Sequence, residues 1–249
     1  TKAIIPVHLF GQSCNMCAIM QIAKKHNLFI VEDAAQSLGS KFKGSELEHF
    51  SSGTLGDIGT TSFYPSKNLG CVGDGGAIFT NDHTLADKIR LLVNHGQRKK
   101  YYHEAIGVNS RLDALQAAIL SIKLNYLTDF NKIRFQCALK YNSHLSSLNW
   151  IKTPEQSPHS SHIFHQYSIL LSEKIDRGQL QKHLAKNGIP TMIYYPIPIH
   201  QQVAYQKYKV KDYPVADKVS RHILSLPMHT ELDDNQIVFI CNTIKKFIH

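Results

Sequence analysis

Short apolar runs alternate with helix-like segments through the first half of the sequence. The runs at 2–10 and 28–33 are apolar at successive positions, as is typical of strands buried on both faces of a parallel sheet. Between them, residues 16–27 have the spacing of an amphipathic helix. The alternation continues with strand-like runs at 58–64 and 76–80 and helix-like runs at 82–96 and 110–124. This pattern predicts an α/β domain built on a mainly parallel sheet.

The pattern changes from about residue 131. A helical run at 132–148 leads to a link with prolines and serines, and then come a strand-like run at 163–171 and a helix-like run at 176–188. A third apolar run, at 189–200, also reads as a strand, and a last amphipathic helix carries Ile237, Ile240, Cys241 and Ile244 on one face. We therefore expect a large domain over residues 1–130 and a smaller α+β domain over residues 131–249.

The composition narrows the class of partner. The chain has 249 residues, 43% of them hydrophobic, which is enough for a substantial core. It has no apolar run of 18 residues and no signal-peptide pattern at its start, so we expect no membrane partner. The formal net charge is +9, but only the residues at 98–100 form a basic cluster and no nucleic-acid-binding motif accompanies them. A phosphorylated small molecule is therefore the expected acidic partner, and nucleic acid is not.

The cysteines indicate a reduced, cytoplasmic protein. Five cysteines are too few and too scattered for a disulfide framework. Cys14 and Cys17 form a C-x-x-C motif, which leaves a redox pair or half of a zinc site open. The same residues also read as the start of the helix at 16–27, where Ser13 or Asn15 could cap. No second ligand pair at suitable spacing is evident, so we expect no metal site.

A lysine among turn-forming and aromatic residues is the first candidate for chemistry. Lys67 stands in the run TSFYPSKNLG, directly after a predicted strand. It could be a solvated surface lysine, or it could be a desolvated amine that acts as a nucleophile. Asp33 ends the predicted strand at 28–33, where ligands of open α/β sheets bind, although it could also cap a helix. Ser62 could bind a phosphate or complete a turn.

These groups suit one cofactor. In enzymes that use pyridoxal 5'-phosphate, a lysine forms a Schiff base with the cofactor, a carboxylate keeps the pyridine nitrogen protonated, and a hydroxyl binds the phosphate. Lys67, Asp33 and Ser62 supply one group of each kind. The sequence therefore favours a pyridoxal phosphate enzyme over the alternatives for each residue taken alone.

Longer stretches carry a family resemblance. The segments VHLFGQ, VEDAAQS, GDIGTTSFYPSKNLG, GVNSRLD, YPIPIH and YPVADKVSRHILSLPMH resemble the DegT/DnrJ/EryC1/StrS family of sugar-nucleotide aminotransferases. The resemblance covers essentially the whole chain, and the segment SFYPSKNLG is highly specific. It implies a fold-type I pyridoxal phosphate transferase that moves an amino group, from glutamate as the expected donor, onto a nucleotide-diphosphate-linked keto sugar for surface polysaccharide or glycan biosynthesis. The similarity is greatest to members that act on 3-keto sugars.

The resemblance also implies roles for individual residues. Lys67 would bind the cofactor and move the proton, Asp33 would pair with the pyridine nitrogen, and Gln36 would contact the phenolic oxygen side of the ring. Ser62 would bind the cofactor phosphate. Asn109 would reach the partner subunit's phosphate site in a homodimer with shared active sites, although the residue could simply cap a helix. Tyr195 and His200 would bind the nucleotide sugar, although both could be packing residues at a domain edge.

Three departures and two alternatives remain. Tyr194 stands where the family often has histidine, the segment between Asp33 and Lys67 is long, and relatives have roughly a hundred further residues ahead of Thr1 by resemblance. We therefore expect the N-terminal part of the large domain to be missing. A non-catalytic truncated relic is one alternative. A sugar dehydratase of the same family is the other, but those enzymes have histidine in place of the lysine.

Overall fold

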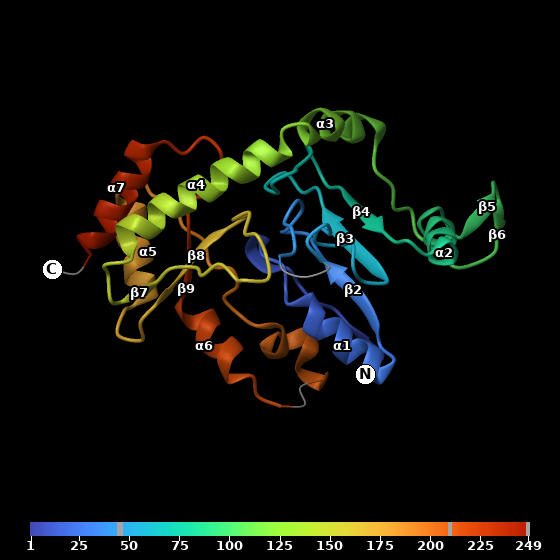
Figure 1. Cartoon of the computed structure of the whole chain (residues 1–249), viewed down its shortest axis with the longest axis horizontal. Helices are drawn as coiled ribbons and strands as arrows, with labels where there is room; N and C mark the ends of the chain where they lie inside the picture. Colours follow the sequence, from blue (N-terminus) through green and yellow to red (C-terminus); the bar gives the residue numbers. More distant parts are fainter. Residues whose placement is uncertain (44–46, 209–210, 248–249) are drawn as a thin grey trace. The chain divides into compact units, whose positions relative to one another are not determined.

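The structure is a computed structural model that describes residues 1–43, 47–208 and 211–247. The chain divides into two compact units. The first unit contains Thr1–Lys132 and Gln156–His165. The second contains Ile133–Glu155 and Gln166–His249. Figure 1 shows the elements in order along the chain.

A four-stranded sheet organises the first unit. Its strands, in spatial order, are β1 (Ala3–Ile4), β2 (Phe29–Asp33), β3 (Ile58–Ser62) and β4 (Gly76–Phe79). The pairs β1–β2 and β2–β3 are parallel, and β4 is antiparallel to β3. The expected mainly parallel sheet is therefore confirmed.

Helix α1 (Met16–His26) covers part of this sheet. The Asn15 side chain accepts a hydrogen bond from the Ala18 N–H over 3.3 Å. Of the two candidates, Ser13 and Asn15, it is therefore Asn15 that caps the helix. Met16 and Ala23 are buried with Ile30 and Phe42 in one apolar cluster. The amphipathic spacing thus predicted this helix and its inner face correctly.

The first unit contains further helices and strands. They are η1 (Leu9–Gly11), α2 (His83–Val93), β5 (Gln97–Lys99), β6 (Tyr102–His103), α3 (Ala114–Leu124) and the start of α4 (Leu127–Leu145). Figure 1 shows α2 and the β5–β6 hairpin beyond the edge strand β4. The helix expected from residue 110 begins only at Ala114, because residues 109–113 form no helical turn. Leu120 is its buried residue, whereas Leu115 and Ile122 are exposed.

The segment 156–165 returns to the first unit. The Ser161 N–H donates to the Lys41 carbonyl over 2.8 Å, and the Ile163 N–H donates to the Gly11 carbonyl over 2.9 Å. Ser160 Oγ accepts a hydrogen bond of 2.9 Å from the Ser13 N–H. The proline- and serine-bearing link is therefore built into the first unit by backbone hydrogen bonds.

The second unit contains an antiparallel sheet covered by helices. The strands are β7 (Ile151–Lys152), β8 (Tyr167–Leu171) and β9 (Ile223–Leu226), with β8 in the middle. The other elements are the rest of α4, α5 (Arg177–Lys186), η3 (Ile199–Gln201), η4 (Val203–Tyr208), α6 (Pro214–His222) and α7 (Asp234–Lys245). No helix in the described part of the chain is long and apolar enough to cross a membrane.

Two of the apolar patterns predicted in this unit have opposite outcomes. The face of α7 that was expected to point inward is buried as predicted. The strand expected at 189–200 is wrong, because only Met192 makes a β-bridge there, to Ser225. Prolines at 190, 196 and 198 lack the N–H that a sheet ladder needs, so the run cannot pair along its length.

Candidate active site

Two of the proposed site residues end neighbouring parallel strands. Asp33 is the last residue of β2 and Ser62 the last of β3. Asp33 stands opposite Thr60 in the parallel register. Because successive side chains of a strand point to opposite faces, Asp33, Thr60 and Ser62 share one face of the sheet. The carboxylate and the hydroxyl therefore meet at the edge where ligands of open α/β sheets bind.

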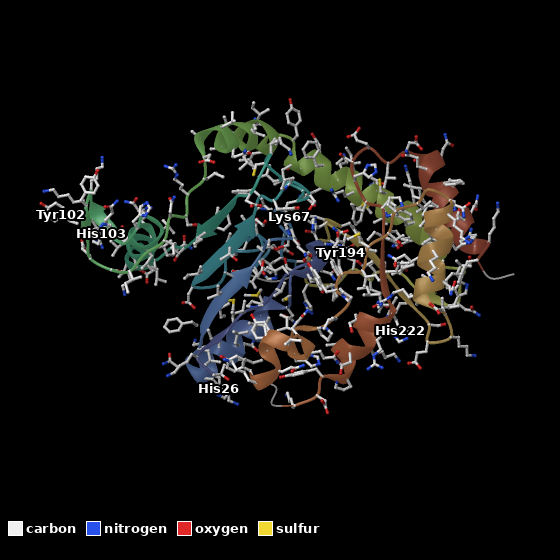
Figure 2. The ribbon with its side chains drawn as sticks, turned by 180° about the vertical axis from the view of Figure 1, so that it is seen from behind. His26, Lys67, Tyr102, His103, Tyr194 and His222 are labelled. Atoms are coloured by element: carbon white, nitrogen blue, oxygen red, sulfur yellow. The ribbon has the colours of Figure 1, made fainter. Side chains whose placement is uncertain are left out.

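Lys67 lies in the turn that follows β3 (Figure 2). Its N–H donates to the Tyr64 carbonyl over 2.8 Å, and the Cys71 N–H donates to the Phe63 carbonyl over 2.8 Å to close the wider loop. The loop is tight at Gly70, because a Cβ at this position would overlap the carbonyl oxygen of Pro65. This backbone holds the half-buried Lys67 side chain just beyond the sheet edge.

Burial changes the acidity of this lysine. Desolvation lowers the pKa of the Lys67 ammonium from its ordinary value, and the negative charge of Asp33 opposes the shift. The Lys67 ammonium therefore loses its proton at a lower pH than the ammonium of a solvated lysine does. The neutral amine that results is the form that attacks a carbonyl. Within the described residues, Lys67 Nζ has no hydrogen-bond partner, so the amine is available for a ligand.

Asn68 anchors the lysine turn and was missed by the sequence interpretation. It is buried, and its Nδ2 donates to Asn131 Oδ1 over 2.7 Å and to the Ile163 carbonyl over 3.3 Å. Its Oδ1 lies 3.2 Å from His165 Nδ1. Contacts with Ile163 and His165 of the segment 156–165 thus hold the lysine turn in place. No local pattern marks Asn68, because its partners are far away in sequence.

Asp33 does not cap a helix. Residues 35–39 form turns, and Asp33 Oδ1 accepts a hydrogen bond from the Ala35 N–H over 3.0 Å. Gln36 follows in this turn, and its Oε1 accepts from the Phe10 N–H over 2.8 Å. The contact ties η1 to the end of β2 and places the Gln36 amide near the same sheet edge.

The neighbouring acid, Glu32, has a different environment. It is wholly buried on the opposite face, where Oε2 accepts hydrogen bonds from His8 Nε2 over 2.8 Å and from the Gly53 N–H over 2.9 Å. Oε1 accepts from the N–H groups of Leu55 and Gly56, each over 2.6 Å. Burial alone raises the pKa of a carboxyl, but these hydrogen bonds lower the pKa of Glu32 below its usual value. The only signal in the sequence is a charged residue inside an apolar run.

The other proposed residues lie elsewhere. Asn109 is exposed and bridges Asn94 at the end of α2. It lines a pocket of about 650 Å³ beside β3 and β4 whose lining residues do not include Lys67 or Asp33. Tyr195 and His200 belong to the second unit, where Tyr195 is 51% exposed and His200 Nε2 lies 2.8 Å from Asp217 Oδ1. The structure thus brings Asp33, Gln36, Ser62 and Lys67 to the same edge of the sheet. The roles predicted for Asn109, Tyr195 and His200 stay predictions.

The cysteine motif contains no disulfide. Cys14 and Cys17 are free, and Cys14 Sγ donates to the Val7 carbonyl over 3.2 Å. Among the described residues, no group of three histidine, cysteine or acidic side chains is placed to hold a metal ion.

Comparisons with known proteins agree with the residue pattern. The sequence model of the DegT/DnrJ/EryC1/StrS aminotransferase family matches residues 1–245. A "Pleiotropic regulatory protein" of Geobacillus stearothermophilus is 44% identical over 99% of this chain and 65% of its own length. The "UDP-2-acetamido-2-deoxy-3-oxo-D-glucuronate aminotransferase" of Pseudomonas aeruginosa is 44% identical over 97% of this chain and 64% of its own length. The chain thus spans about 65% of the length of curated relatives it matches.

Solved structures share the fold. The structure of S. venezuelae DesV in complex with a ketimine intermediate superposes with a TM-score of 0.90 at 38% identity, covering 99% of this chain and 65% of that one. The expected fold class, a pyridoxal phosphate-dependent transferase fold, is therefore confirmed.

Proposed function

Because the chain belongs to the DegT/DnrJ/EryC1/StrS aminotransferase family, we propose that the protein transfers an amino group to a nucleotide-diphosphate-linked keto sugar. Aminotransferases of this family depend on pyridoxal phosphate, and one similar solved structure contains the bound cofactor PMP. Glutamate is the proposed amino donor, and the product is proposed to enter surface polysaccharide or glycan synthesis. Relatives named for UDP- and dTDP-linked sugars support this substrate class.

One observation carries the proposal. The half-buried Lys67 amine, whose pKa is lowered by desolvation, lies within the electrostatic reach of Asp33 at the carboxyl ends of adjacent parallel strands. An amine, a carboxylate and the hydroxyl of Ser62 at one sheet edge form the donor set that pyridoxal phosphate needs. The residues present therefore fit the cofactor.

Each residue then has a distinct task. Lys67 Nζ would hold the cofactor covalently in the resting enzyme, and the same amine, when free of the cofactor, would move the proton that the transfer requires. Asp33 would keep a proton on the ring nitrogen, Ser62 Oγ would donate to the phosphate, and Gln36 would contact the phenolic oxygen side. When bound, the cofactor supplies a ring that withdraws electrons from the carbon that gains or loses the amine.

The proposed assembly is a cytoplasmic homodimer with shared sites. In it, Asn109 of the partner subunit contacts the cofactor phosphate, while Tyr195 and His200 contact the nucleotide sugar. The exposure of Asn109 supports this role, because the side chain is available to a second subunit. The proposed domains are a cofactor-binding domain over residues 1–130 and a smaller domain over residues 131–249. Lys67 argues against the dehydratase alternative, and the intact donor set argues against a non-catalytic relic.

The test is to reduce the full-length protein with borohydride in the presence of pyridoxal phosphate and to map the label by peptide mass analysis. We expect the label on Lys67 and its loss in Lys67→Gln. The exposed Lys132 provides a matched control, because Lys132→Gln should keep the label. A label on any other lysine would overturn the assignment.

A further inference from the structure

Two asparagines join the lysine turn to the turn segment that follows β2. Asn68 Nδ2 donates to Asn131 Oδ1 over 2.7 Å, and Asn131 Nδ2 donates in turn to the Leu38 carbonyl over 3.2 Å. Asn68 comes directly after Lys67, and Leu38 lies in the turn segment 35–39. This amide bridge, formed by Asn68 and Asn131, therefore connects the loops at the carboxyl ends of β2 and β3.

The amide bridge is buried and directional. Asn68 and Asn131 are each 8% exposed, so water competes little for their amides. His165 Nδ1 lies 3.2 Å from Asn68 Oδ1, and because an amide oxygen can only accept, the ring nitrogen is the donor. Asn68 Nδ2 is thereby turned toward Asn131 and the Ile163 carbonyl. The orientation of the bridge is thus fixed by hydrogen bonds at both of its ends.

Helix α4 carries one side of the bridge and packs against both loops. Leu127 and Asn131 are four residues apart on α4 and therefore share one face. Leu127 is buried in one apolar cluster with Leu69, and Leu38 packs against the same cluster. Gly39 makes the close approach possible, since a Cβ there would lie 2.7 Å from Asn131 Nδ2 and its φ is +90°. One face of α4 thus contacts the loop after each strand.

The two loops adjoin groups that act on each other. Asp33 is the last residue of β2, and Lys67 stands in the turn after β3. Desolvation lowers the pKa of the Lys67 ammonium, and the charge of Asp33 opposes this shift. A Coulomb interaction weakens as the separation grows, so the acidity of Lys67 depends on where the loops hold the two groups.

We propose that the amide bridge of Asn68 and Asn131 is a positioning device of the candidate active site. It sets the spacing between the Lys67 amine and the Asp33 carboxylate, so that both groups can contact one cofactor at the same time. The inference rests on the proposed function for what the two groups bind. The spacing itself is a property of the chain without cofactor and can be measured there.

The experiment measures how fast acetic anhydride labels Lys67 as a function of pH, by peptide mass spectrometry of the full-length protein without cofactor. We expect Asn68→Ala and Asn131→Ala each to raise the rate at neutral pH about threefold. The reason is that a more distant Asp33 charge stabilises the ammonium less, so that more of the lysine is neutral amine. The double variant should label no faster than either single variant, because one bridge can be cut only once.

The Asp33→Asn background shows whether the effect passes through the carboxylate. Labelling of Lys67 should already be fast there, and Asn131→Ala should change it no further. A rise that came only from better access of the reagent would persist in this background. Gly39→Ala is a second route to the bridge, because its methyl group displaces Asn131 Nδ2 without removing an amide, and it should give the same threefold rise.

Two controls accompany these variants. Asn142→Ala, also on α4, removes a side-chain amide that accepts a hydrogen bond of 2.6 Å from the Tyr167 hydroxyl, and it should leave the labelling of Lys67 unchanged. The exposed Lys182 of α5 is the reference lysine in every sample. Circular dichroism establishes that each variant is folded.

Labelling of Lys67 at the parent's rate in the folded bridge variants would overturn the inference, and so would an equal rise in the Asp33→Asn background. Neither outcome touches the proposed function, which the borohydride label on Lys67 tests separately. If that label fails while the labelling rates change as expected, the proposed function is lost and the positioning role of the bridge stands.

Discussion

His8 Nε2 lies 2.8 Å from Glu32 Oε2, and both side chains are fully buried. His8 Nδ1 accepts the Cys14 N–H over 3.0 Å, so Nε2 is the nitrogen that donates to the carboxylate. Through its other hydrogen bonds, Glu32 holds the backbone of residues 53–56, which leads into β3. Two successive acids of one strand thus have separate tasks, because Glu32 fixes the loop before β3 while Asp33 faces the candidate site.

Removing Glu32 should be costly. We expect Glu32→Ala to lower the free energy of unfolding by about 3 kcal/mol or more, because buried N–H groups and His8 lose their acceptor. Urea unfolding of the full-length protein measures the change. The control is Glu104→Ala, which breaks an exposed pair with Arg98 and should cost at most about 1 kcal/mol. Equal losses for the two variants would contradict a special role for Glu32.

A methyl group at Gly70 should displace the lysine turn. Its Cβ would overlap the Pro65 carbonyl oxygen and lie 2.8 Å from the Tyr64 carbonyl oxygen, and both atoms are backbone. We therefore expect Gly70→Ala to lose the visible absorption of bound pyridoxal phosphate. Gly73→Ala is a control in the same loop, since its nearest contact is 3.4 Å, to the flexible Gln116 side chain. Normal cofactor absorption in Gly70→Ala would show that the turn is not required.

The lowered pKa of Lys67 predicts a pH-dependent stability. Because the folded-state pKa lies below the ordinary value of 10.5, the unfolded chain binds more protons in the interval between the two pKa values, and stability rises with pH there. Lys67→Met should therefore be more stable than the parent at pH 7, both without cofactor. This advantage should shrink as the pH approaches 10.5. Denaturant unfolding across this pH range measures it, and a constant difference would argue against a shifted lysine.

Asp33 should matter for turnover more than for cofactor retention. Asp33→Ala should keep the cofactor bound but slow turnover roughly a hundredfold or more, because an unprotonated pyridine ring withdraws electrons poorly. Absorption spectra and single-turnover rates separate the two effects. Asp33→Asn is the informative second variant, since it preserves shape and removes charge. A near-normal rate in Asp33→Asn would mean that the carboxylate does not pair with the ring nitrogen.

A shared site predicts complementation between inactive subunits. Full-length Lys67→Ala and Asn109→Ala proteins should each be inactive or nearly so. Mixed under conditions of subunit exchange, they should regain activity, because a hybrid dimer has both lesions in one site and an intact second site. Mass spectrometry of the mixture establishes the exchange. If hybrids form and activity stays absent, Asn109 does not act across the interface.

Local patterns determined several elements of this protein by themselves. The inner faces of α1 and α7 follow from the 3.6-residue period of their apolar positions, which requires no information from distant residues. The turn of Lys67 follows from Pro65 and the glycines around it. The position of Asp33 at the end of a predicted strand indicates a ligand-binding sheet edge, and the register of β2 and β3 places Ser62 on the same face of the sheet.

Only the tertiary structure decided which side chains are bonded to each other. Glu32 reaches residues 53–56, Asn68 reaches Asn131, and residues 160–163 pair with residues 11–13 and 41. It also decided that Leu115 and Ile122 are exposed, and that the proline-bearing run at 189–200 forms no strand. The physical reason is that a buried polar group takes whichever partner the folded chain brings within about 3 Å, and sequence spacing does not encode that distance.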